Sequence, residues 1–353
     1  MMSAAQTSRT PVLSVEDLSV EYVTAGAAYP ALSGVTLELA PGEFLGVVGE
    51  SGCGKSTLAA AALGLLPANA DSRGSIRFDG EPLAGMSSTR LRELRGGDVG
   101  LIPQDPLASL DPTFSVGSQI VETLRAHQRI ARRAAKARAV ELMDTVGIDR
   151  PAERFGQPPR AFSGGMRQRI AIAIAVANTP RLLIADEPTT ALDVTVQAQV
   201  LRLLTRLAKD RNMAVLFISH DLHVVTQLCD RVAVLYAGKL SEVGPARDVM
   251  DHPAHPYTAA LLASIPQGRT TGRLPSIPGE IGQAALLPGC RFAPRCAHRM
   301  PVCDTEPPLA ARDRGGVAAC WLAASSAPAT LAEAGPVAAS RRDVQSGGRK
   351  DVP

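Results

Sequence analysis

The chain has 353 residues, of which 45% are hydrophobic and 20% charged, and its formal net charge is +3. This length allows two domains or one large domain with an extension, and the hydrophobic fraction allows a sizeable core. The small charge and an aromatic content of 3% argue against nucleic-acid binding, because they provide neither a strong positive field nor many stacking platforms. The longest apolar run, residues 170–177, is far shorter than the roughly 20 residues of a membrane span. Residues 1–11 lack the apolar segment of a signal peptide, so we expect a cytosolic protein that reaches a membrane only through a partner.

The first part of the chain predicts strands that lead to a glycine-rich turn. Apolar and polar residues alternate over 12–23, which is typical of a strand, and residues 35–39 form a second strand-like segment. Residues 44–48 (FLGVV) form a short apolar run that indicates a buried strand. Further apolar strands are predicted at 182–185 and 215–218.

A helical segment separates these two groups of strands. Residues 105–162 show helical periodicity, with apolar anchors at Ile120, Leu124, Leu142 and Val146. The most basic run, 125–138, lies inside this segment, and its interleaved alanines favour one helix with a solvated face. The order of the elements predicts an α/β core with a helical insertion.

The turn after the buried strand matches a phosphate-binding loop. Residues 49–57 (GESGCGKST) agree with G-x-x-x-x-G-K-S/T, and they lie between a predicted strand and an apolar helix. Backbone N–H groups at the glycines surround the phosphates, Lys55 reaches the β and γ oxygens, and Ser56 binds Mg²⁺. Cys53 is interpreted as a small filler of the turn, and a redox switch is the alternative. The nucleotide-binding residues expected here are Gly49, Ser51, Gly52, Cys53, Gly54, Lys55, Ser56 and Thr57.

The strand predicted at 182–185 leads into two carboxylates. A buried strand that ends at Asp186 would deliver this carboxylate to the Mg²⁺ coordination shell. Glu187 would then orient or deprotonate the attacking water. A strand that ends in a solvated acidic turn is the alternative.

Residues 162–169 (FSGGMRQR) form a second candidate anion site. A Ser-Gly-Gly turn leads into an apolar helix, and N–H groups at such a helix N-terminus attract phosphate oxygens. The residues concerned are Ser163, Gly164 and Gly165. An ordinary turn before a core helix is the alternative.

These motifs, in this order over residues 12–245, resemble the ABC ATPases. The resemblance implies an α/β fold with a P-loop NTPase core, an antiparallel β subdomain and a helical subdomain at about 105–162. It also implies that Ser163, Gly164 and Gly165 hold the nucleotide of a second ABC ATPase subunit, either identical or a sister. The segment 188–193 (PTTALD), which includes Asp193, follows the family pattern. Two residues depart from it, since Phe162 replaces leucine and Pro103 replaces a bulkier apolar residue.

The resemblance assigns further roles in ATP binding and hydrolysis. It implies that Gln104 contacts Mg²⁺ and water, while its loop senses the transmembrane partner. It implies that His220 contacts the γ-phosphate and positions Glu187. It also implies that Tyr22 stacks on the adenine, with Tyr29 as the alternative because only strand register separates the two. The implied catalytic residues are Glu187, His220, Gln104 and Lys55, and the Mg²⁺ ligands are Ser56, Gln104 and Asp186.

Other segments resemble importers of the oligopeptide and dipeptide type. These are residues 105–112 (DPLASLDP) and 193–197 (DVTVQ), together with 255–258 (HPYT) and 288–296 (PGCRFAPRC) of a C-terminal extension. The extension is placed at 246–325, and residues 326–353 have the composition of a disordered tail.

This resemblance also implies the partners and the location of the protein. The implied partners are two transmembrane permease subunits and an extracytoplasmic solute-binding protein, with no nucleic acid. The chain would be peripheral, at the cytoplasmic face of the inner membrane. Nickel chelates or glutathione are the alternative cargoes. A soluble ABC ATPase that acts on DNA or ribosomes is disfavoured by the single cassette and the short interval between Gln104 and Ser163.

Four of the six cysteines cluster near the C-terminus with the spacing C-x5-C-x6-C-x16-C. In a cytosolic chain such clustering indicates a metal rather than disulfides. A 4Fe-4S cluster with a structural role is the favoured hypothesis, because zinc sites prefer tighter cysteine pairs. Zinc, the absence of a metal, and a redox or metal sensor are the alternatives. The ligands would be Cys290, Cys296, Cys303 and Cys320.

Overall fold

The computed structural model describes residues 10–24, 26–190, 192–265, 277–282 and 284–325. The predicted tail at 326–353 lies outside these residues.

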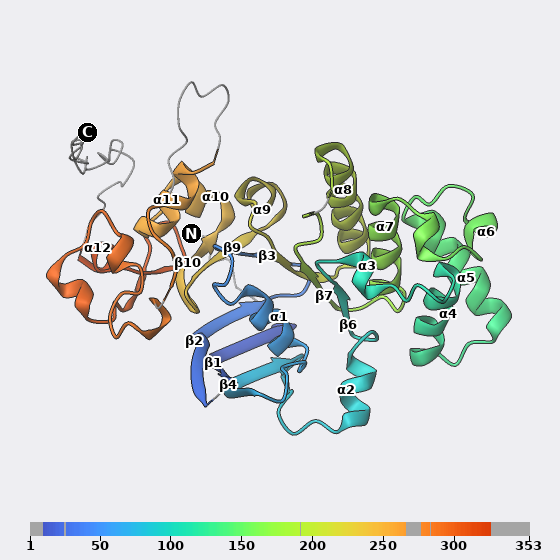
Figure 1. Cartoon of the computed structure of the whole chain (residues 1–353), viewed down its shortest axis with the longest axis horizontal. Helices are drawn as coiled ribbons and strands as arrows, with labels where there is room; N and C mark the ends of the chain where they lie inside the picture. Colours follow the sequence, from blue (N-terminus) through green and yellow to red (C-terminus); the bar gives the residue numbers. More distant parts are fainter. Residues whose placement is uncertain (1–9, 25, 191, 266–276, 283, 326–353) are drawn as a thin grey trace, which may run out of the picture.

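An eight-stranded sheet forms the centre of the molecule (Figure 1). Five neighbouring strands run parallel, and three more extend the sheet antiparallel beyond them. In spatial order the strands are β11 (Leu309–Ala311), β12 (Val317–Ala319), β10 (Lys239–Pro245), β9 (Arg231–Tyr236), β3 (Phe44–Val48), β8 (Ala214–Ile218), β7 (Leu182–Asp186) and β6 (Val99–Ile102).

The central strands are apolar on both faces because each face packs against a separate core. In β3, Phe44 and Val48 belong to the core on one side, which also contains helical side chains. Leu45 and Val47 belong to the core on the other side, which is shared with the antiparallel strands. Successive side chains of a strand point to opposite faces, so a run without polar residues predicts a strand covered on both sides. The three central strands predicted from such runs are confirmed.

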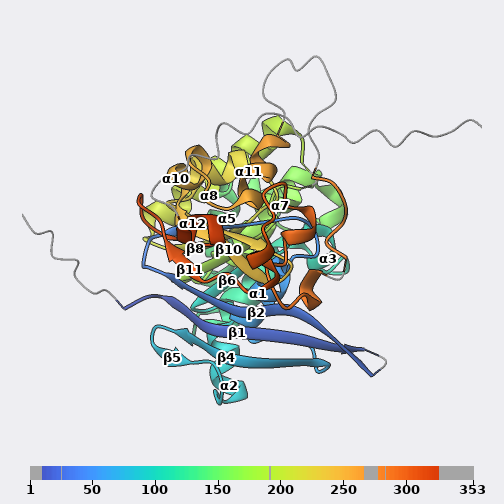
Figure 2. The same cartoon turned by 90° about the vertical axis from the view of Figure 1, so that its left-hand side faces the viewer.

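A second, antiparallel sheet forms a separate layer (Figure 2). The helix α1 (Lys55–Ala62) follows the phosphate-binding loop and contacts both β1 and β7, so it lies between the two sheets. Strands predicted at 12–23 and 35–39 are confirmed, although the second begins earlier, at Ala27. In spatial order the strands are β2 (Ala27–Leu39), β1 (Leu13–Thr24), β4 (Ala70–Phe78) and β5 (Glu81–Pro82).

The predicted helical insertion is present, but its basic run does not form one helix. The first helix ends at His127 and the next begins at Arg132, because Gln128 and Ala131 adopt extended backbone conformations. The insertion contains α3 (Pro106–Ser109), α4 (Val116–His127), α5 (Arg132–Thr145), α6 (Pro151–Arg154) and a 3-10 turn at Pro159–Ala161.

The other helices lie outside the helical insertion, and the last three of them belong to the C-terminal region. None of the helices in the described part of the chain is long and apolar enough to cross a bilayer. The helices outside the insertion are α2 (Ser88–Leu94), α7 (Gly164–Ala175), α8 (Val194–Asp210), α9 (Leu222–Leu228), α10 (Ala246–Asp251), α11 (Pro256–Ala263) and α12 (Trp321–Ser325), with 3-10 turns at Ala284–Leu286, Ala293–Arg295 and Pro301–Asp304.

The C-terminal region is joined to the main sheet. Strand β12 pairs with β10, so the sheet continues past residue 245, where we expected the extension to begin. This region lies at one end of the molecule, and helices α4 to α6 lie at the opposite end (Figure 1). Although the sequence shows little periodicity after residue 245, this region contains two regular helices, α10 and α11, and a strand pair.

Candidate nucleotide-binding site

Four neighbouring parallel strands bring the predicted residues to one edge of the main sheet. The phosphate-binding loop follows β3, His220 follows β8, Asp186 ends β7, and Gln104 follows β6. Ligands of open α/β sheets bind at the carboxyl ends of the strands. Segments separated by more than a hundred residues thus contribute to one site.

The phosphate-binding loop has a backbone that requires glycine. Gly52 and Gly54 have φ angles of +78° and +107°, in the left-handed region. A Cβ atom at Gly54 would lie 2.5 Å from the carbonyl oxygen of Ala31, so a side chain would also clash. No side chain caps the N-terminus of α1, which leaves its first N–H groups available to an anion.

Lys55 is folded into this loop. Its Nζ donates hydrogen bonds to the carbonyl oxygens of Gly49 at 2.8 Å and Glu50 at 3.0 Å. The residue is only 6% exposed, so its positive charge is concentrated inside the loop. Cys53 is fully buried, and burial raises the pKa of its thiol although Lys55 acts in the opposite direction. This environment agrees with the interpretation of Cys53 as a filler of the turn.

Asp186 and Ser56 provide oxygen atoms suited to Mg²⁺. The Oδ1 atom of Asp186 is buried and has no hydrogen-bond partner. Burial raises the pKa of the Asp186 carboxyl, and a hydrogen bond from the Ser56 side chain opposes this shift. Mg²⁺ prefers carboxylate and hydroxyl oxygens, and an unpartnered buried oxygen is costly unless a cation or donor joins it. The donor set therefore fits the ion.

Glu187 is surrounded by three side chains. Its Oε2 accepts hydrogen bonds from Thr190 Oγ1 at 2.9 Å and Gln104 Nε2 at 3.4 Å, and it lies 3.1 Å from His220 Nδ1. The Glu187 side chain is 16% exposed, and its φ angle of +45° is unusual for a residue other than glycine. Such conformations cost about 1–3 kcal/mol and concentrate at functional sites. We had not assigned a role to Thr190, although it lies three residues after Glu187 in the segment that pointed to the family.

The two tyrosine candidates for adenine stacking are direct partners across β1 and β2. Directly opposed residues lie on the same face of a sheet, so register does not place one inside and the other outside. Tyr22 Oη lies 3.3 Å from Thr57 Oγ1, in the first turn of α1, whereas Tyr29 is 58% exposed. The contact with the phosphate-binding loop favours Tyr22.

The Ser-Gly-Gly turn begins α7, and its two glycines differ. Ser163 caps the helix, since its Oγ accepts a hydrogen bond from the N–H of Met166 at 3.3 Å. A Cβ atom at Gly165 would lie 2.5 Å from Val196 Cγ1, whereas one at Gly164 would meet nothing within 4 Å. No hydrogen bond joins this turn to the phosphate-binding loop within the described residues.

Two neighbouring residues have clear structural roles. Asp193 caps α8 by accepting a hydrogen bond from the N–H of Val196 at 2.9 Å. Phe162 is 3% exposed and lies in the larger core, so an aromatic ring replaces the family's leucine without loss of burial.

The four clustered cysteines line one small cavity, together with His298, Met300 and Trp321. Its volume is about 10 Å³, roughly the minimum for one water molecule and too small for an iron–sulfur cluster. Burial raises the pKa of Cys290 and Cys320, and raises that of Cys296 to about 11.

The sulfur atoms are also engaged by the backbone. The N–H groups of His298 and Met300 donate to the sulfur atoms of Cys296 and Cys303, at 3.3 and 3.4 Å. The described residues contain no group of three or more His, Cys, Asp or Glu side chains arranged to hold a metal ion. The prediction of a 4Fe-4S cluster is therefore not supported, and neither is that of zinc.

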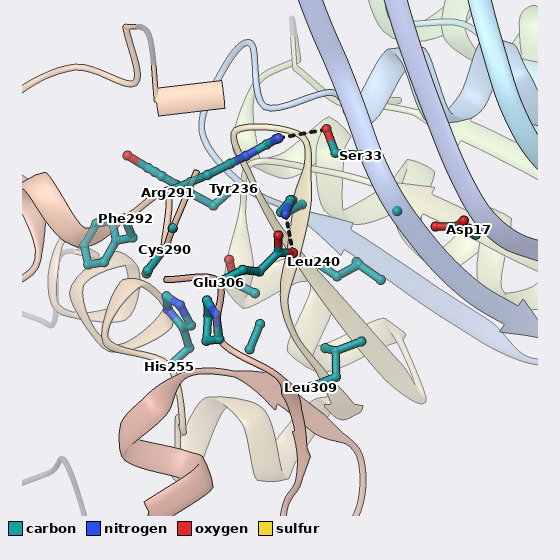
Figure 3. A pocket seen from close by; sticks show the side chains of 16 residues that line it. Asp17, Ser33, Tyr236, Leu240, His255, Cys290, Arg291, Phe292, Glu306 and Leu309 are labelled. Carbon is teal, nitrogen blue, oxygen red and sulfur yellow. Dashed lines mark hydrogen bonds and ion pairs between the residues drawn. The ribbon is translucent and has the colours of Figure 1, made fainter. Parts of the chain in front are cut away.

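A larger cavity, of about 320 Å³, lies between the β1–β2 and β9–β10 strand pairs and the C-terminal region (Figure 3). Arg291 crosses it and donates a hydrogen bond to Ser33 Oγ at 2.8 Å. None of the residues predicted to bind ATP lines this cavity. The candidate nucleotide site is instead the edge of the sheet described above.

Comparisons with known proteins identify two regions of this chain. Residues 32–190 match the family model "ABC transporter", and residues 241–303 match "Oligopeptide/dipeptide transporter, C-terminal region". The dipeptide transport ATP-binding protein DppD of Bacillus subtilis (strain 168) is 44% identical over 316 residues, covering 88% of this chain and 94% of the relative. The oligopeptide transport ATP-binding protein OppD of Escherichia coli (strain K12) is 43% identical over 319 residues, covering 90% and 95%.

Solved structures agree with this result. The ATP-binding cassette MJ0796, solved as a dimer in a post-hydrolysis state with ADP and Pi, has a TM-score of 0.60 and 25% identity and covers 67% of this chain and 99% of its own. The cassette cbiO1 of Clostridium perfringens has a TM-score of 0.59 and 27% identity, covering 69% and 92%. The chain therefore belongs to the ABC transporter family, as an ATP-hydrolysing subunit with the C-terminal region found in oligopeptide and dipeptide transporters.

Proposed function

We propose that the chain powers the import of oligopeptides or dipeptides, and that Glu187 activates the water that attacks ATP. The observation that carries the proposal is the position of Glu187 beside His220, at the edge that also holds the phosphate-binding loop. The names of the relatives support the peptide cargo. The same names do not favour the alternative cargoes, nickel chelates and glutathione.

Binding of ATP would use the loop and its lysine. Free N–H groups at the start of α1 and the charge of Lys55 attract the β and γ phosphates. Ser56 and Asp186 would hold Mg²⁺, with Gln104 at the rim of the site. The ion would neutralise the charge that develops on the phosphates during hydrolysis. Tyr22, which contacts Thr57, is placed to stack on the adenine.

Glu187 has the environment of a general base. His220, Thr190 and Gln104 all engage Oε2, so the carboxylate is held in one orientation. The other oxygen, Oε1, accepts no hydrogen bond from the residues that the structure describes. This oxygen is available to accept a proton from the attacking water. His220, whose side chain is 58% exposed, is placed to contact the γ-phosphate.

A complete site would need a second ABC ATPase subunit. Gly164 lies at the N-terminus of α7, and a Cβ atom there would meet none of the described residues within 4 Å, so packing among these residues does not require glycine. A phosphate that approaches the turn from a partner would provide the reason. Ser163, Gly164 and Gly165 would then hold the nucleotide of the partner, with Asp193 nearby at the start of α8. The dimer of MJ0796 with ADP and Pi supports this arrangement.

The helical insertion is the proposed contact with two transmembrane permease subunits. Leu107 and Phe114 follow Gln104 in the chain, and they are 51% and 55% exposed. Exposed apolar side chains of this size favour a protein partner. The subunit would thus be peripheral, at the cytoplasmic face of the inner membrane, in a complex that receives peptides from an extracytoplasmic solute-binding protein. Residues 12–245 would form the ATPase domain and residues 246–325 the C-terminal domain.

Uptake by cells that lack this chain tests the cargo. We expect loss of labelled di- and oligopeptide uptake, restored by the wild-type chain but not by the Glu187→Gln variant. Nickel and glutathione uptake should be unchanged. Loss of nickel or glutathione uptake with normal peptide uptake would contradict the proposed cargo but not the ATPase activity.

A further inference from the structure

The C-terminal region makes a direct ionic contact with the phosphate-binding loop. Arg295 donates two hydrogen bonds to the Glu50 carboxylate, from Nη1 to Oε2 at 2.6 Å and from Nη2 to Oε1 at 2.9 Å. Its side chain is 7% exposed and that of Glu50 is 27% exposed. Paired hydrogen bonds of this kind fix orientation as well as charge. Glu50 is the second residue of the loop, directly after Gly49.

A second contact reaches the backbone of the same residue. The N–H of Glu50 donates to Tyr257 Oη at 2.9 Å. The Tyr257 ring packs against Tyr236, with ring centroids 4.6 Å apart, and Tyr236 packs against Phe292 at 5.2 Å. Tyr236 also accepts a hydrogen bond from Arg295 at 3.2 Å. A buried aromatic cluster therefore holds both groups that contact Glu50.

A neighbouring arginine supports a second position of the loop, its middle. Arg291 donates to the carbonyl oxygen of Ala237, and it also donates to Ser33 Oγ, as Figure 3 shows. Ala237 lies in the turn between β9 and β10, and the next residue, Gly238, donates its N–H to the carbonyl oxygen of Cys53 at 2.9 Å. The segment 290–296 thus braces the loop directly at Glu50 and, through this turn, at Cys53.

The charge of Glu50 makes its contact with Arg295 important for ATP binding. A carboxylate in the phosphate-binding loop repels phosphate groups, and the repulsion is stronger at a partly buried position than in bulk water. Lys55 donates to the carbonyl oxygen of Glu50, so a movement of Glu50 would also move the lysine's partner. Arg295 neutralises the carboxylate and fixes its orientation, while Tyr257 holds the backbone N–H of the same residue.

We propose that Arg295 is a positioning residue for ATP binding, so that the C-terminal region forms part of the nucleotide site by way of Glu50. The proposal rests on the proposed binding of ATP at Lys55. It gives residues 246–325 a role in the affinity for nucleotide. Glu50 and Arg295 are separated by 245 residues, and only the folded chain brings them together.

The test measures Mg-ATP affinity, KM and kcat on the full-length chain with the substitution Arg295→Gln. We expect affinity to fall about tenfold, since a hydrogen-bonded charge pair contributes on this scale, and KM to rise while kcat changes little. The double variant Arg295→Gln/Glu50→Gln should recover most of the affinity, because the unpaired carboxylate is gone. Arg295→Lys keeps the positive charge but loses the paired hydrogen bonds of the guanidinium group. Its affinity for Mg-ATP should lie between those of the wild type and Arg295→Gln. This milder variant decides the question if Arg295→Gln does not fold.

The matched control is Arg299→Gln, in the same segment. Arg299 is 54% exposed and pairs with Asp304 rather than with a residue of the loop. The affinity of the Arg299→Gln variant for Mg-ATP should therefore match that of the wild type. Wild-type affinity in Arg295→Gln, or a loss that Glu50→Gln does not restore, would overturn the proposal. If the wild-type chain itself binds no Mg-ATP, or if Lys55→Ala binds it equally well, the proposed function fails instead.

Discussion

His220 Nδ1 lies 3.1 Å from Glu187 Oε2, and the two residues follow neighbouring parallel strands, β8 and β7. The histidine thereby restricts the orientation of a carboxylate whose backbone is already in an unfavourable conformation. Thr190 and Gln104 engage the same oxygen. Three side chains thus fix the orientation of the carboxylate, which is the arrangement expected of a general base.

The substitution Glu187→Gln should separate ATP binding from hydrolysis. The amide keeps the size of the side chain but cannot take a proton from water, so we expect turnover to fall by about 100-fold or more. Nucleotide affinity should remain, because Lys55 and the loop are unchanged. Phosphate release and nucleotide titration measure the two properties. The control is Glu141→Gln on the exposed face of α5, which should be fully active. Wild-type turnover in Glu187→Gln would sink the assigned chemistry.

The substitution Gly164→Asp should abolish hydrolysis without affecting the folded chain. A Cβ atom at Gly164 meets none of the described residues within 4 Å, so the melting temperature should not change. The affinity of the phosphate-binding loop for nucleotide should not change either. The negative charge of the new side chain would repel the phosphates of a partner's nucleotide at the start of α7. Thermal unfolding, nucleotide titration and ATPase assays measure these properties.

Gly156 provides the matched control for Gly164. A Cβ atom there also meets nothing within 4 Å, and the residue lies outside the predicted site, so Gly156→Asp should be active. Normal hydrolysis in Gly164→Asp would show that the Ser-Gly-Gly turn is only a helix start.

The stability of the protein should fall in mild acid because of His255. This residue is buried, and burial lowers the pKa of its imidazole from 6.5 to about 4. The unfolded chain then binds a proton more readily than the folded chain, so the contribution of His255 is complete above pH 6.5 and is lost as the pH falls towards 4. We expect a loss of about 2 kcal/mol between pH 7 and pH 5.

Urea unfolding at the two pH values measures this loss. His255 Nδ1 accepts a hydrogen bond from the N–H of Tyr257, at the start of α11. The variant His255→Asn can keep this cap but cannot be protonated, so the pH dependence should weaken. His223→Asn changes an exposed histidine and should leave the dependence intact. An equal pH dependence in wild type and His255→Asn would disprove the assignment.

The buried pair of Arg312 and Glu242 should be essential for the stability of the C-terminal region. Arg312 Nε lies 3.0 Å from Glu242 Oε1, and the side chains are 5% and 0% exposed. Removal of one partner leaves the other charge buried, so Arg312→Leu should destabilise the protein by about 3–5 kcal/mol. Denaturant unfolding measures the effect, with Arg314→Leu, at an exposed position, as the control. A loss as small as that of the control would mean that water or another group compensates Glu242.

The parts of the nucleotide site that could be predicted from the sequence lie in short continuous segments. The phosphate-binding loop is one continuous segment whose glycines and lysine have fixed spacing, so its chemistry could be predicted residue by residue. The central strands were visible because strands covered on both faces have no polar residues. The polar strand β4 (Ala70–Phe78) was missed for the opposite reason, since most of its side chains are exposed, on both faces, and it contains no apolar run.

The relative positions of distant segments could not be predicted in this way. The opposition of Tyr22 and Tyr29 depends on strand register, which the tertiary structure decides. The cysteine spacing suggested a metal, but the fold places the four thiols around a cavity of about 10 Å³. Spacing along a chain limits which ligands can meet but does not set the space between them.

The sequence by itself determined the family of the chain, and it predicted a loop for phosphates, a carboxylate that activates water and a second anion site for the nucleotide of a partner. Only the tertiary structure decided that the C-terminal region extends the main sheet and that Arg295 pairs with Glu50. A local motif can be recognised from neighbouring residues, because the backbone geometry of a few residues is enough to form it. A contact across 245 residues depends on how whole layers pack, and no periodicity along the chain records it.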